Sequence, residues 1–356
     1  MKNRLKFITL SFFIFISIIT GGCEIPSVLS DSNSLKDAEL TVSFIDVGQG
    51  DATLIECGNE AMLIDAGLYS QRHKVLSYIA NQGINKLDYC VATHPHSDHI
   101  GAMSQVIYNF NVETLVYPVC DENAESFNYV LDACDERGVS YLNPKLYDTL
   151  KVGDATLTVL SPDKGEKFDN VNNYSLILKL EYKNVSFMFT GDAEADVEKE
   201  LVKRGENLRA DVLKCGHHGS STSSSAAFIN AVNPAAAVIS CQEGNDYGHP
   251  HRETISTLEK RNIEIYRTDL DSTIVAASDG ETITFYSGNE VLGTATANTE
   301  TVTSPTYSYI GNKNSKVFHS LDCSSLISTK DKNKVYFITR DEAESKNYSP
   351  CKACNP

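Results

Sequence analysis

The sequence predicts a mixed α/β fold in which helices cover β-sheets, and three observations lead to this prediction. The chain has 356 residues, of which 41% are hydrophobic and 22% charged, an ordinary composition for a globular protein with a sizeable core. Between residues 40 and 67, the short runs LTVSFIDV, ATLIEC and AMLIDAG alternate with the turn sequences GQGD and GNE, as in a meander of strands. Farther along, strand-like and helix-like segments alternate over some 250 residues, which is typical of sheets that helices cover.

Each later element follows from its own pattern. Apolar residues recur with a helical period in QRHKVLSYIANQ, residues 71–82, and further helical segments are expected at 101–110, 123–137, 193–204, 222–232 and 252–262. Short runs rich in β-branched and other apolar residues predict strands at 88–93, 155–160, 174–182, 185–190, 211–215, 236–241, 263–267 and 273–286. We assign all of these elements to one domain, residues 39–290.

The start of the chain reads as an export signal. A basic head precedes the uncharged run 7–22, which is shorter than the roughly 20 residues that cross a bilayer comfortably, so residues 1–22 are predicted to be a secretory signal. The sequence ITGGC resembles the cleavage region of bacterial lipoproteins, which implies lipidation of Cys23 and a membrane anchor. An uncleaved anchor and plain secretion are the alternatives. All three place the body outside the cytoplasm, as a cell-surface lipoprotein or a secreted protein, on the polar tether 23–38.

The rest of the chain completes the predicted organisation. No run after residue 22 is long and apolar enough to span a membrane, so we expect no transmembrane channel in this chain. Residues 291–306 are rich in Thr and lack periodicity, which predicts a linker. Residues 307–356 would then form a separate small module. We expect no disulfide framework, although a bond between Cys120 and Cys134 is possible.

One short segment carries the clearest chemical signal. Residues 93–100 read THPHSDHI and follow an apolar strand. Alternate residues of an extended segment point the same way, so His94 and His96 can share one metal ion, while Asp98 and His99 can reach a second. The chain has only nine histidines, and a chance cluster of this kind is a poor explanation.

With these motifs, residues 40–288 resemble the metallo-β-lactamase superfamily. The resemblance implies a four-layer αββα sandwich with two divalent metal ions at one edge of the paired sheets. It implies that Asp46 supports the metal loop and that Asp192 in FTGDAE bridges the two ions. In LKCGHHGS we expect His218 to be a ligand and His217 to be a substrate or proton-transfer contact.

A sharper resemblance is to the hydrolase domain of ComEC-type DNA-uptake proteins. It rests on FIDVGQGDATLIE, THPHSDHIGA, NNYSLIL, FTGDAE, DVLKCGHHGSSTSS and NDYGHPH. As in that subgroup, no histidine lies between His99 and Asp192, where Asn173 and Ser175 stand, so one metal would keep only three ligands and could be zinc or manganese. His249 in NDYGHPH could donate a hydrogen bond to a phosphate, or the segment could be an ordinary turn.

The resemblance also implies a mechanism. Two cations about 3.5 to 4 Å apart, bridged by Asp192, would hold a hydroxide that attacks a phosphoryl or carbonyl group. Asp98 would be a metal ligand first and could also handle the proton. With His217, these two carboxylates are the expected catalytic residues.

The C-terminal module has the pattern of a structural zinc site. Two closely spaced ligand pairs are present, and each can hold one edge of a tetrahedron: His319 with Cys323, and Cys351 with Cys354. A module of about fifty residues buries little core, so a metal ion would stabilise it. The arrangement looks like the metal-binding domain of Ada-type DNA repair proteins, with His319 in place of a cysteine. A disulfide between two of the three cysteines is the alternative.

The charge distribution restricts the substrates. The formal net charge is −16, and between the basic head and the last fifty residues there are 20 basic and 42 acidic residues. Loose electrostatic adhesion to nucleic acid or anionic lipid is therefore not expected, because such binding needs Lys and Arg to neutralise phosphates. A polyanionic substrate would have to be held by the metal ions and the basic tail.

We therefore expect an exported metal-dependent hydrolase of phosphodiesters, nuclease-like and related to competence DNA uptake. Two alternatives keep the enzyme site and change the substrate, to a cell-wall phosphodiester such as a choline-decorated teichoic acid or phosphorylcholine, or to a small-molecule phosphodiester. A third alternative is a non-catalytic DNA-binding adaptor that the metal ions stabilise. Hydrolysis of β-lactams fits the motifs poorly.

Overall fold

The computed structural model describes residues 38–120, 125–163, 165–297, 309–320, 323, 329, 333–337, 340–354 and 356. The predicted signal 1–22, the lipidation site Cys23 and nearly all of the tether lie outside the described residues. Residues 298–306 of the predicted linker also lie outside them. In the described part of the chain, no helix is long and apolar enough to cross a membrane.

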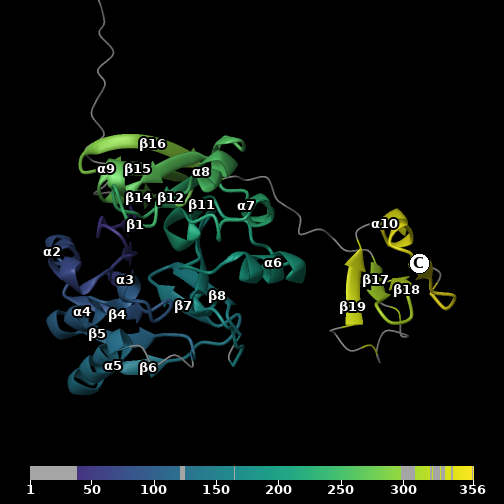
Figure 1. Cartoon of the computed structure of the whole chain (residues 1–356), viewed down its shortest axis with the longest axis horizontal. Coiled ribbons are helices and arrows are strands. Elements are labelled where there is room, and N and C mark those ends of the chain that lie inside the picture. Colours follow the sequence, from purple (N-terminus) through teal and green to yellow (C-terminus); the bar gives the residue numbers. More distant parts are fainter. Residues whose placement is uncertain are drawn as a thin grey trace, which may run out of the picture.

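Two sheets form the centre of the larger domain (Figure 1). In the part that the structure describes, the first sheet has nine strands in the order β16-β15-β14-β1-β2-β3-β4-β5-β6. Their bounds are Leu40–Phe44 (β1), Thr53–Cys57 (β2), Glu60–Ile64 (β3), Lys86–Val91 (β4), Asn111–Val116 (β5), Ser140–Leu142 (β6), Ile274–Ser278 (β14), Thr282–Ser287 (β15) and Glu290–Thr296 (β16). The second sheet has the order β13-β12-β11-β10-β9-β8-β7. Its strands are Thr149–Val152 (β7), Ala155–Ser161 (β8), Ile177–Tyr182 (β9), Val185–Phe189 (β10), Val212–Lys214 (β11), Ala236–Ile239 (β12) and Glu264–Arg267 (β13).

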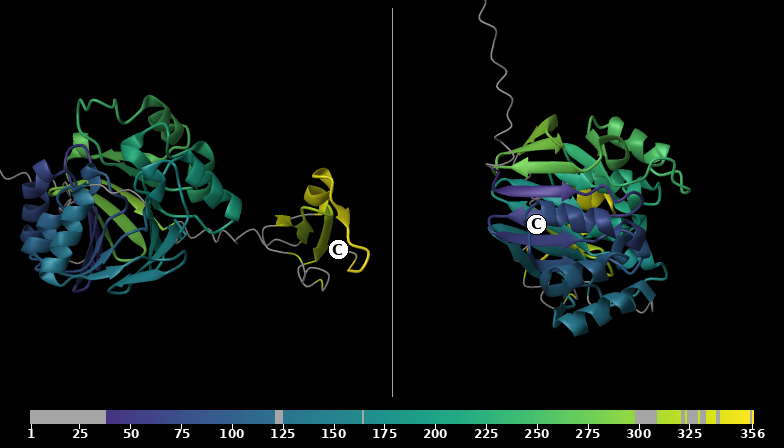
Figure 2. Two further views of the ribbon diagram at one scale, coloured as in Figure 1. Left: turned by 60° about the horizontal axis from the view of Figure 1, so that its bottom comes forward. Right: turned by 90° about the vertical axis from the view of Figure 1, so that its left-hand side faces the viewer.

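Helices cover the outer faces of the two sheets. The α-helices are Arg72–Asn81 (α2), Ser97–Ile100 (α3), Met103–Asn109 (α4), Glu125–Arg137 (α5), Ala195–Arg204 (α6), Ala226–Val232 (α7), Arg252–Glu259 (α8) and Thr268–Asp271 (α9). Short 3-10 helices span Tyr69–Gln71 (η1), Val171–Tyr174 (η2) and Gly216–Gly219 (η3). In the left view of Figure 2, α2, α4 and α5 lie on one side of the sheets, and α6, α7 and α8 lie on the other.

The core confirms the predicted four-layer αββα arrangement. One apolar cluster joins the inner faces of both sheets and includes Phe44 of β1 and Phe187 of β10, both fully buried. A second cluster lies between the first sheet and α2, α4 and α5, and a third between the second sheet and α6, α7 and α8. Successive side chains of a strand point to opposite faces of the sheet, and both faces of each sheet pack against another layer. Both sets of side chains are therefore apolar, which explains the nearly unbroken apolar runs in the sequence.

Several element boundaries differ from the sequence-based prediction. Residues 291–296, predicted to belong to a linker, form most of β16, which pairs with β15 in an antiparallel ladder. Its alternating Thr and apolar residues suit a half-exposed edge strand, although they lack the apolar density of a core strand. The predicted strand 273–286 is a hairpin of β14 and β15. The helix expected from residue 222 begins at Ala226, because the Ser225 hydroxyl caps it by accepting a hydrogen bond from the Phe228 amide.

The C-terminal residues form a separate small sheet in the order β19-β17-β18-β20. The strands are Tyr309–Asn312 (β17), Val317–Ser320 (β18), Lys334–Phe337 (β19) and Ser349–Pro350 (β20), and α10 spans Arg340–Ser345. Its apolar centre is small and is built around Phe318, Phe337 and Tyr348. So small a core makes a stabilising metal ion physically useful.

Candidate metal centre

The histidine-rich segment lies where β4 ends. β4 runs parallel to both β3 and β5, so the chain leaves it at the same sheet edge at which β3 ends. After a bend at His94 and Pro95, the short helix α3 turns the chain, and the amides of His99 and Ile100 donate hydrogen bonds to the His96 carbonyl. This turn brings Asp98 and His99 beside His94, as the spacing of the motif predicts.

The predicted ligands converge in two groups. Asp98, His99, Asp192 and His218 each offer one ligand atom, and these atoms lie within 4.8 Å of one another. His94, His96 and Asp192 form a second group by the same measure. Asp192 is therefore common to both groups.

Asp192 is held by the residues that stand where a third histidine is missing. It follows β10, and its amide donates a hydrogen bond of 2.9 Å to the Ser175 hydroxyl, which also lies 3.2 Å from Nδ1 of His94. Oδ1 of Asn173 accepts a hydrogen bond from the Glu194 amide at 2.9 Å. Asn173 and Ser175 are buried. Their position favours support of the Asp192 turn over direct contact with substrate.

The two histidines after β11 have different surroundings. His218 is buried, and its Nε2 lies 3.2 Å from Oδ2 of Asp98. His217 is partly exposed; its Nδ1 lies 3.2 Å from the Thr222 hydroxyl and its Nε2 lies 3.8 Å from Oδ2 of Asp192. The backbone accounts for this difference, because both residues adopt left-handed angles in η3, with φ of 51° and 54°.

Asp46 does not support the metal loop in the described structure. One of its carboxylate oxygens accepts a hydrogen bond from the Gly48 amide, and the other lies 3.2 Å from Nζ of Lys74. Asp65 occupies the supporting position instead. Its carboxylate lies 2.7 Å from Nδ1 of His99 and accepts hydrogen bonds from the amide and hydroxyl of Thr93. In metal sites, the ring nitrogen of a histidine ligand that does not bind the metal commonly donates a hydrogen bond to a carboxylate, which orients the ring.

A buried ion pair beneath the site was also missed. Asp51 and Lys214 are both buried, and Nζ of Lys214 lies 2.8 Å from Oδ2 of Asp51. Oδ1 of Asp51 lies 3.2 Å from Nδ1 of His218, which also lies 3.1 Å from the Ser240 carbonyl. The signal was present in the sequence as an ammonium group, Lys214, within an otherwise apolar strand. A buried ammonium group needs a nearby carboxylate.

An open pocket gives access to the ligands. It has a volume of about 290 Å³, and its lining includes Asp98, Asp192, His217, His218 and His249. The loop that carries His249 closes one side, and the ring of Tyr247 stacks on the His249 ring at 5.6 Å. The structure thus brings His249 to the pocket, and its contact with a phosphate stays a prediction.

Neighbouring charged groups and burial shift the pKa values of two residues that line the pocket, Asp98 and His249. Burial by itself would raise the pKa of Asp98, but the hydrogen bond with His218 and the charges of His99 and His218 outweigh it and lower this pKa to about 2. Burial lowers the pKa of His249, the neighbouring histidines add to the effect, and the resulting value is about 4. At neutral pH, Asp98 is a carboxylate and His249 is uncharged.

Two of the ligand atoms are buried and make no hydrogen bond within the described part of the chain, as expected for atoms that bind a metal ion. Nε2 of His99 and Oδ1 of Asp192 are buried and lie 3.2 Å apart, yet neither has a hydrogen-bond partner among the described residues. Unpaired buried polar atoms are costly, and a cation between them would remove the cost. Imidazole nitrogens and carboxylate oxygens suit zinc or manganese.

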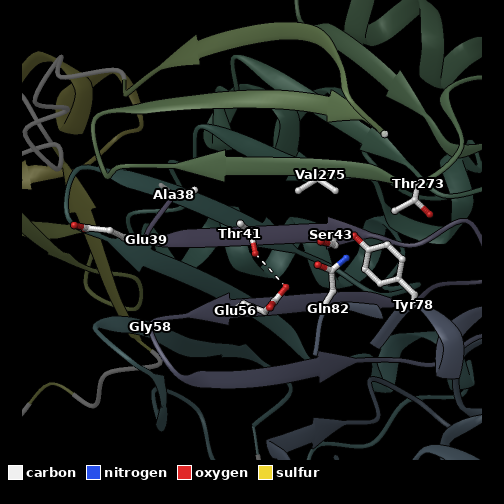
Figure 3. A pocket seen from close by; sticks show the side chains of 11 residues that line it. Ala38, Glu39, Thr41, Ser43, Glu56, Gly58, Tyr78, Gln82, Thr273 and Val275 are labelled. Atoms are coloured by element: carbon white, nitrogen blue, oxygen red, sulfur yellow. Dashed lines mark hydrogen bonds between the residues drawn. The ribbon is translucent and has the colours of Figure 1, made fainter. Parts of the chain in front are cut away.

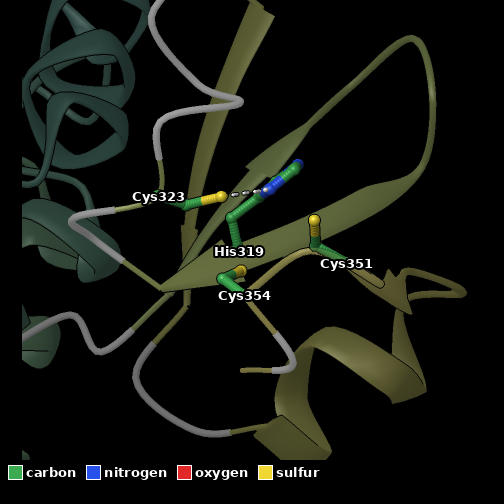
Figure 4. A group of neighbouring side chains, drawn as sticks. All are labelled: His319, Cys323, Cys351 and Cys354. Atoms are coloured by element: carbon green, nitrogen blue, oxygen red, sulfur yellow. Dashed lines mark hydrogen bonds between the residues drawn. The ribbon is translucent and has the colours of Figure 1, made fainter.

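The C-terminal module has its own cluster. His319, Cys323, Cys351 and Cys354 come together with ligand atoms within 4.8 Å of one another (Figure 4). Nδ1 of His319 lies 3.3 Å from Sγ of Cys323. One imidazole and three thiols form a set typical of structural zinc. In the larger domain, Cys134 is a free thiol, so the possible bond with Cys120 is not formed.

A larger hollow on the outer face of the first sheet offers no such chemistry (Figure 3). It has a volume of about 580 Å³, and Thr41, Glu56 and Tyr78 are among its lining residues. No histidine or cysteine is among the described residues that line it. The candidate metal centre is therefore the better site for catalysis.

Comparisons with known proteins identify two families along the chain. Residues 45–243 match the family model of the metallo-beta-lactamase superfamily, and residues 303–356 match that of the metal binding domain of Ada. ComE operon protein 3 of Bacillus subtilis is 34% identical over 277 residues, which cover 72% of this chain and 35% of that protein. Competence protein ComA of Neisseria gonorrhoeae is 29% identical over 245 residues, which cover 68% and 33%. This chain thus spans about a third of the length of these curated relatives.

A solved structure is also similar. The metallo-beta-lactamase fold protein YhfI from Bacillus subtilis aligns with a TM-score of 0.48 and 15% identity, over 67% of this chain and all of that one.

Proposed function

Because this chain belongs to the metallo-beta-lactamase superfamily, as its motifs predicted, we propose that it is a metal-dependent phosphodiesterase. The observation that carries the proposal is the meeting of two ligand groups on Asp192. One cation would be held by Asp98, His99, Asp192 and His218. The other would be held by His94, His96 and Asp192.

Two bound divalent cations would polarise a phosphoryl oxygen and make water acidic enough to attack at neutral pH. The protein supplies orientation and proton transfer. Asp98 is ionised and lines the pocket, so its carboxylate can accept a proton from the attacking water. His217 and His249 line the same pocket, with ring centroids 5.4 Å apart, and can donate hydrogen bonds to the departing oxygen or to a phosphate oxygen.

We propose DNA as the first candidate substrate, because one relative of this chain is named a competence protein. A nuclease of this kind would hold the scissile phosphate at the metal centre, and the basic C-terminal module could add contacts. We propose a phosphodiester other than nucleic acid as the second candidate. The acidic body favours it, since 42 acidic residues face 20 basic ones between the head and the last fifty residues.

We further propose that the protein is exported and anchored through Cys23, on the evidence of the signal-like sequence alone. Labelled palmitate should appear on the wild-type chain and not on a Cys23→Ser variant. Unlabelled wild-type protein with an intact N-terminal segment would contradict this proposal.

The activity is tested with the full-length chain, supplied with Mn²⁺ or Zn²⁺. The substrates are single-stranded DNA, double-stranded DNA and bis(4-nitrophenyl) phosphate. Asp192→Asn keeps the shape of the side chain and removes its charge, so it should lower metal-dependent turnover on the order of a thousandfold. Asp154→Asn makes the same change at an exposed turn and should have no effect.

The outcomes separate the candidates. DNA cleavage that the Asp192→Asn variant loses supports the nuclease. Turnover of the aryl ester alone supports the second candidate. If DNA binds and no substrate is cleaved, the adaptor replaces the enzyme.

A further inference from the structure

A groove adjoins the candidate metal centre. It has a volume of about 1000 Å³ and lies among η1, α3, α4 and α5. His96 and Ser97 line both this groove and the smaller pocket that contains Asp98 and Asp192. The groove and the pocket therefore adjoin each other at these two residues.

Aromatic rings are exposed along this groove. Tyr69, Tyr108 and Tyr129 line it with 52%, 37% and 57% of their surfaces exposed. The hydroxyl of Tyr108 donates a hydrogen bond of 2.9 Å to Glu136, and that of Tyr129 donates one of 2.8 Å to Glu125. These bonds fix the edges of two rings and leave their faces available to a ligand.

The same wall is acidic. Glu125, Asp132 and Glu136 recur at helical spacing on α5, so one face of the helix presents three carboxylates to the groove. No lysine or arginine is among the described residues that line it. The guanidinium of Arg72 lies 4.3 Å from the ring centroid of Tyr69, which shows that a cation can pack on a ring at this wall.

We infer that this groove is a subsite for an organic ammonium group carried by the phosphodiester substrate. This inference rests on the proposed phosphodiesterase function and specifies its substrate. Exposed tyrosine faces bind an ammonium group through cation–π attraction, and three carboxylates in a lining whose described residues include no lysine or arginine add a favourable field.

A nucleic-acid strand fits this wall less well. Its next phosphate would follow the scissile one into or past the groove and would meet three like charges. Bases could stack on the tyrosines, but each base brings a further phosphate with it. Charge therefore favours a substrate whose organic group is cationic.

The test compares two esters that differ by one charge. In 4-nitrophenyl phosphorylcholine the organic group is a quaternary ammonium, and in 4-nitrophenyl 3,3-dimethylbutyl phosphate a carbon atom replaces the nitrogen. With the metal-loaded full-length protein, we expect kcat/KM to be about tenfold higher for the charged ester. The preference should shrink as salt is raised.

Variants locate the effect. In an Asp132→Asn, Glu136→Gln double variant, the ratio of the two kcat/KM values should approach one. Asp154→Asn also removes an exposed carboxylate, outside the groove, and should keep the wild-type ratio. Equal turnover of both esters by the wild type, or an unchanged ratio in the double variant, would overturn the inference and leave the phosphodiesterase proposal intact.

A failure of the proposed function has a different signature. If neither ester is hydrolysed, calorimetric binding of phosphorylcholine and 3,3-dimethylbutyl phosphate tests the groove by itself. Tighter binding of phosphorylcholine that the double variant loses would support the subsite. Equal binding of the two compounds would overturn it.

Discussion

The buried ion pair between Lys214 and Asp51 allows a quantitative test of how the metal centre is supported. In Lys214→Met the ammonium group 2.8 Å from the carboxylate is lost, while a side chain of similar length remains. Burial would raise the pKa of Asp51, but Lys214 and His218 outweigh it and hold this pKa well below its usual range. Without Lys214, the carboxylate stays buried and loses its main cation. Breaking one partner of such a pair costs about 3 to 5 kcal/mol. For a domain of this size, the melting temperature should fall by about 10 °C.

Urea unfolding of the protein in EDTA measures this loss without a contribution from bound metal. Lys203→Met is the matched control, because Lys203 pairs with Glu200 on the surface and should lose less than about 1 kcal/mol. In the Lys214→Met, Asp51→Asn double variant the unpaired charge is absent, so the free energy of unfolding should recover in part. A Lys214→Met variant no less stable than Lys203→Met would refute this reasoning, as would a double variant that loses the sum of both single changes.

Three further predictions concern pH, the tail and a tight turn. Burial lowers the pKa of His218, but Asp192, Asp51 and Asp98 outweigh burial and raise this pKa from 6.5 to about 9. The metal-free protein should therefore lose stability as the pH rises from about 6.5 to 9. An increase in the urea midpoint of unfolding over that range would contradict this prediction. Cys351→Ser should lower the zinc content of the purified full-length chain by one ion in native mass spectrometry, and unchanged zinc would argue against a site in the tail. Gly50→Ala places a Cβ 2.3 Å from the Asp98 carbonyl at a φ of 136°, whereas Gly58→Ala, also at positive φ, meets nothing within 4 Å. The first change should therefore destabilise the protein to urea by about 2 kcal/mol more than the second, and equal losses would contradict the tight approach.

The sequence-based prediction succeeded where the signal was local. The mixed α/β class followed from the alternation of elements, and the spacing of the segment 93–100, with the family resemblance, predicted that its side chains would converge with Asp192. It failed where two residues had the same sequence context and only one of them had the predicted supporting role. Asp46 and Asp65 both follow apolar strands, and only the tertiary structure shows that Asp65 contacts His99.

Backbone conformation and strand pairing were the other features that the sequence concealed. The different surroundings of His217 and His218 depend on left-handed backbone angles, which no residue pattern in GHHG specifies. The edge strand β16 was missed because its stability depends on pairing with β15, a neighbour that an apolarity pattern does not reveal. The ion pair of Lys214 with Asp51 joins residues far apart in the chain, so no local pattern could identify the partner of the lysine.

The carboxylate of Asp192 belongs to both ligand groups, and this has a consequence for occupancy. Two cations that draw on the same charge cannot bind independently, because filling one position changes the field and the geometry that the other experiences. If both positions bind a cation, their affinities are thermodynamically linked, and the linkage is reciprocal. A calorimetric titration of the metal-free protein should therefore show two unequal steps. At limiting metal, a population with one ion per centre would be present alongside the fully loaded form.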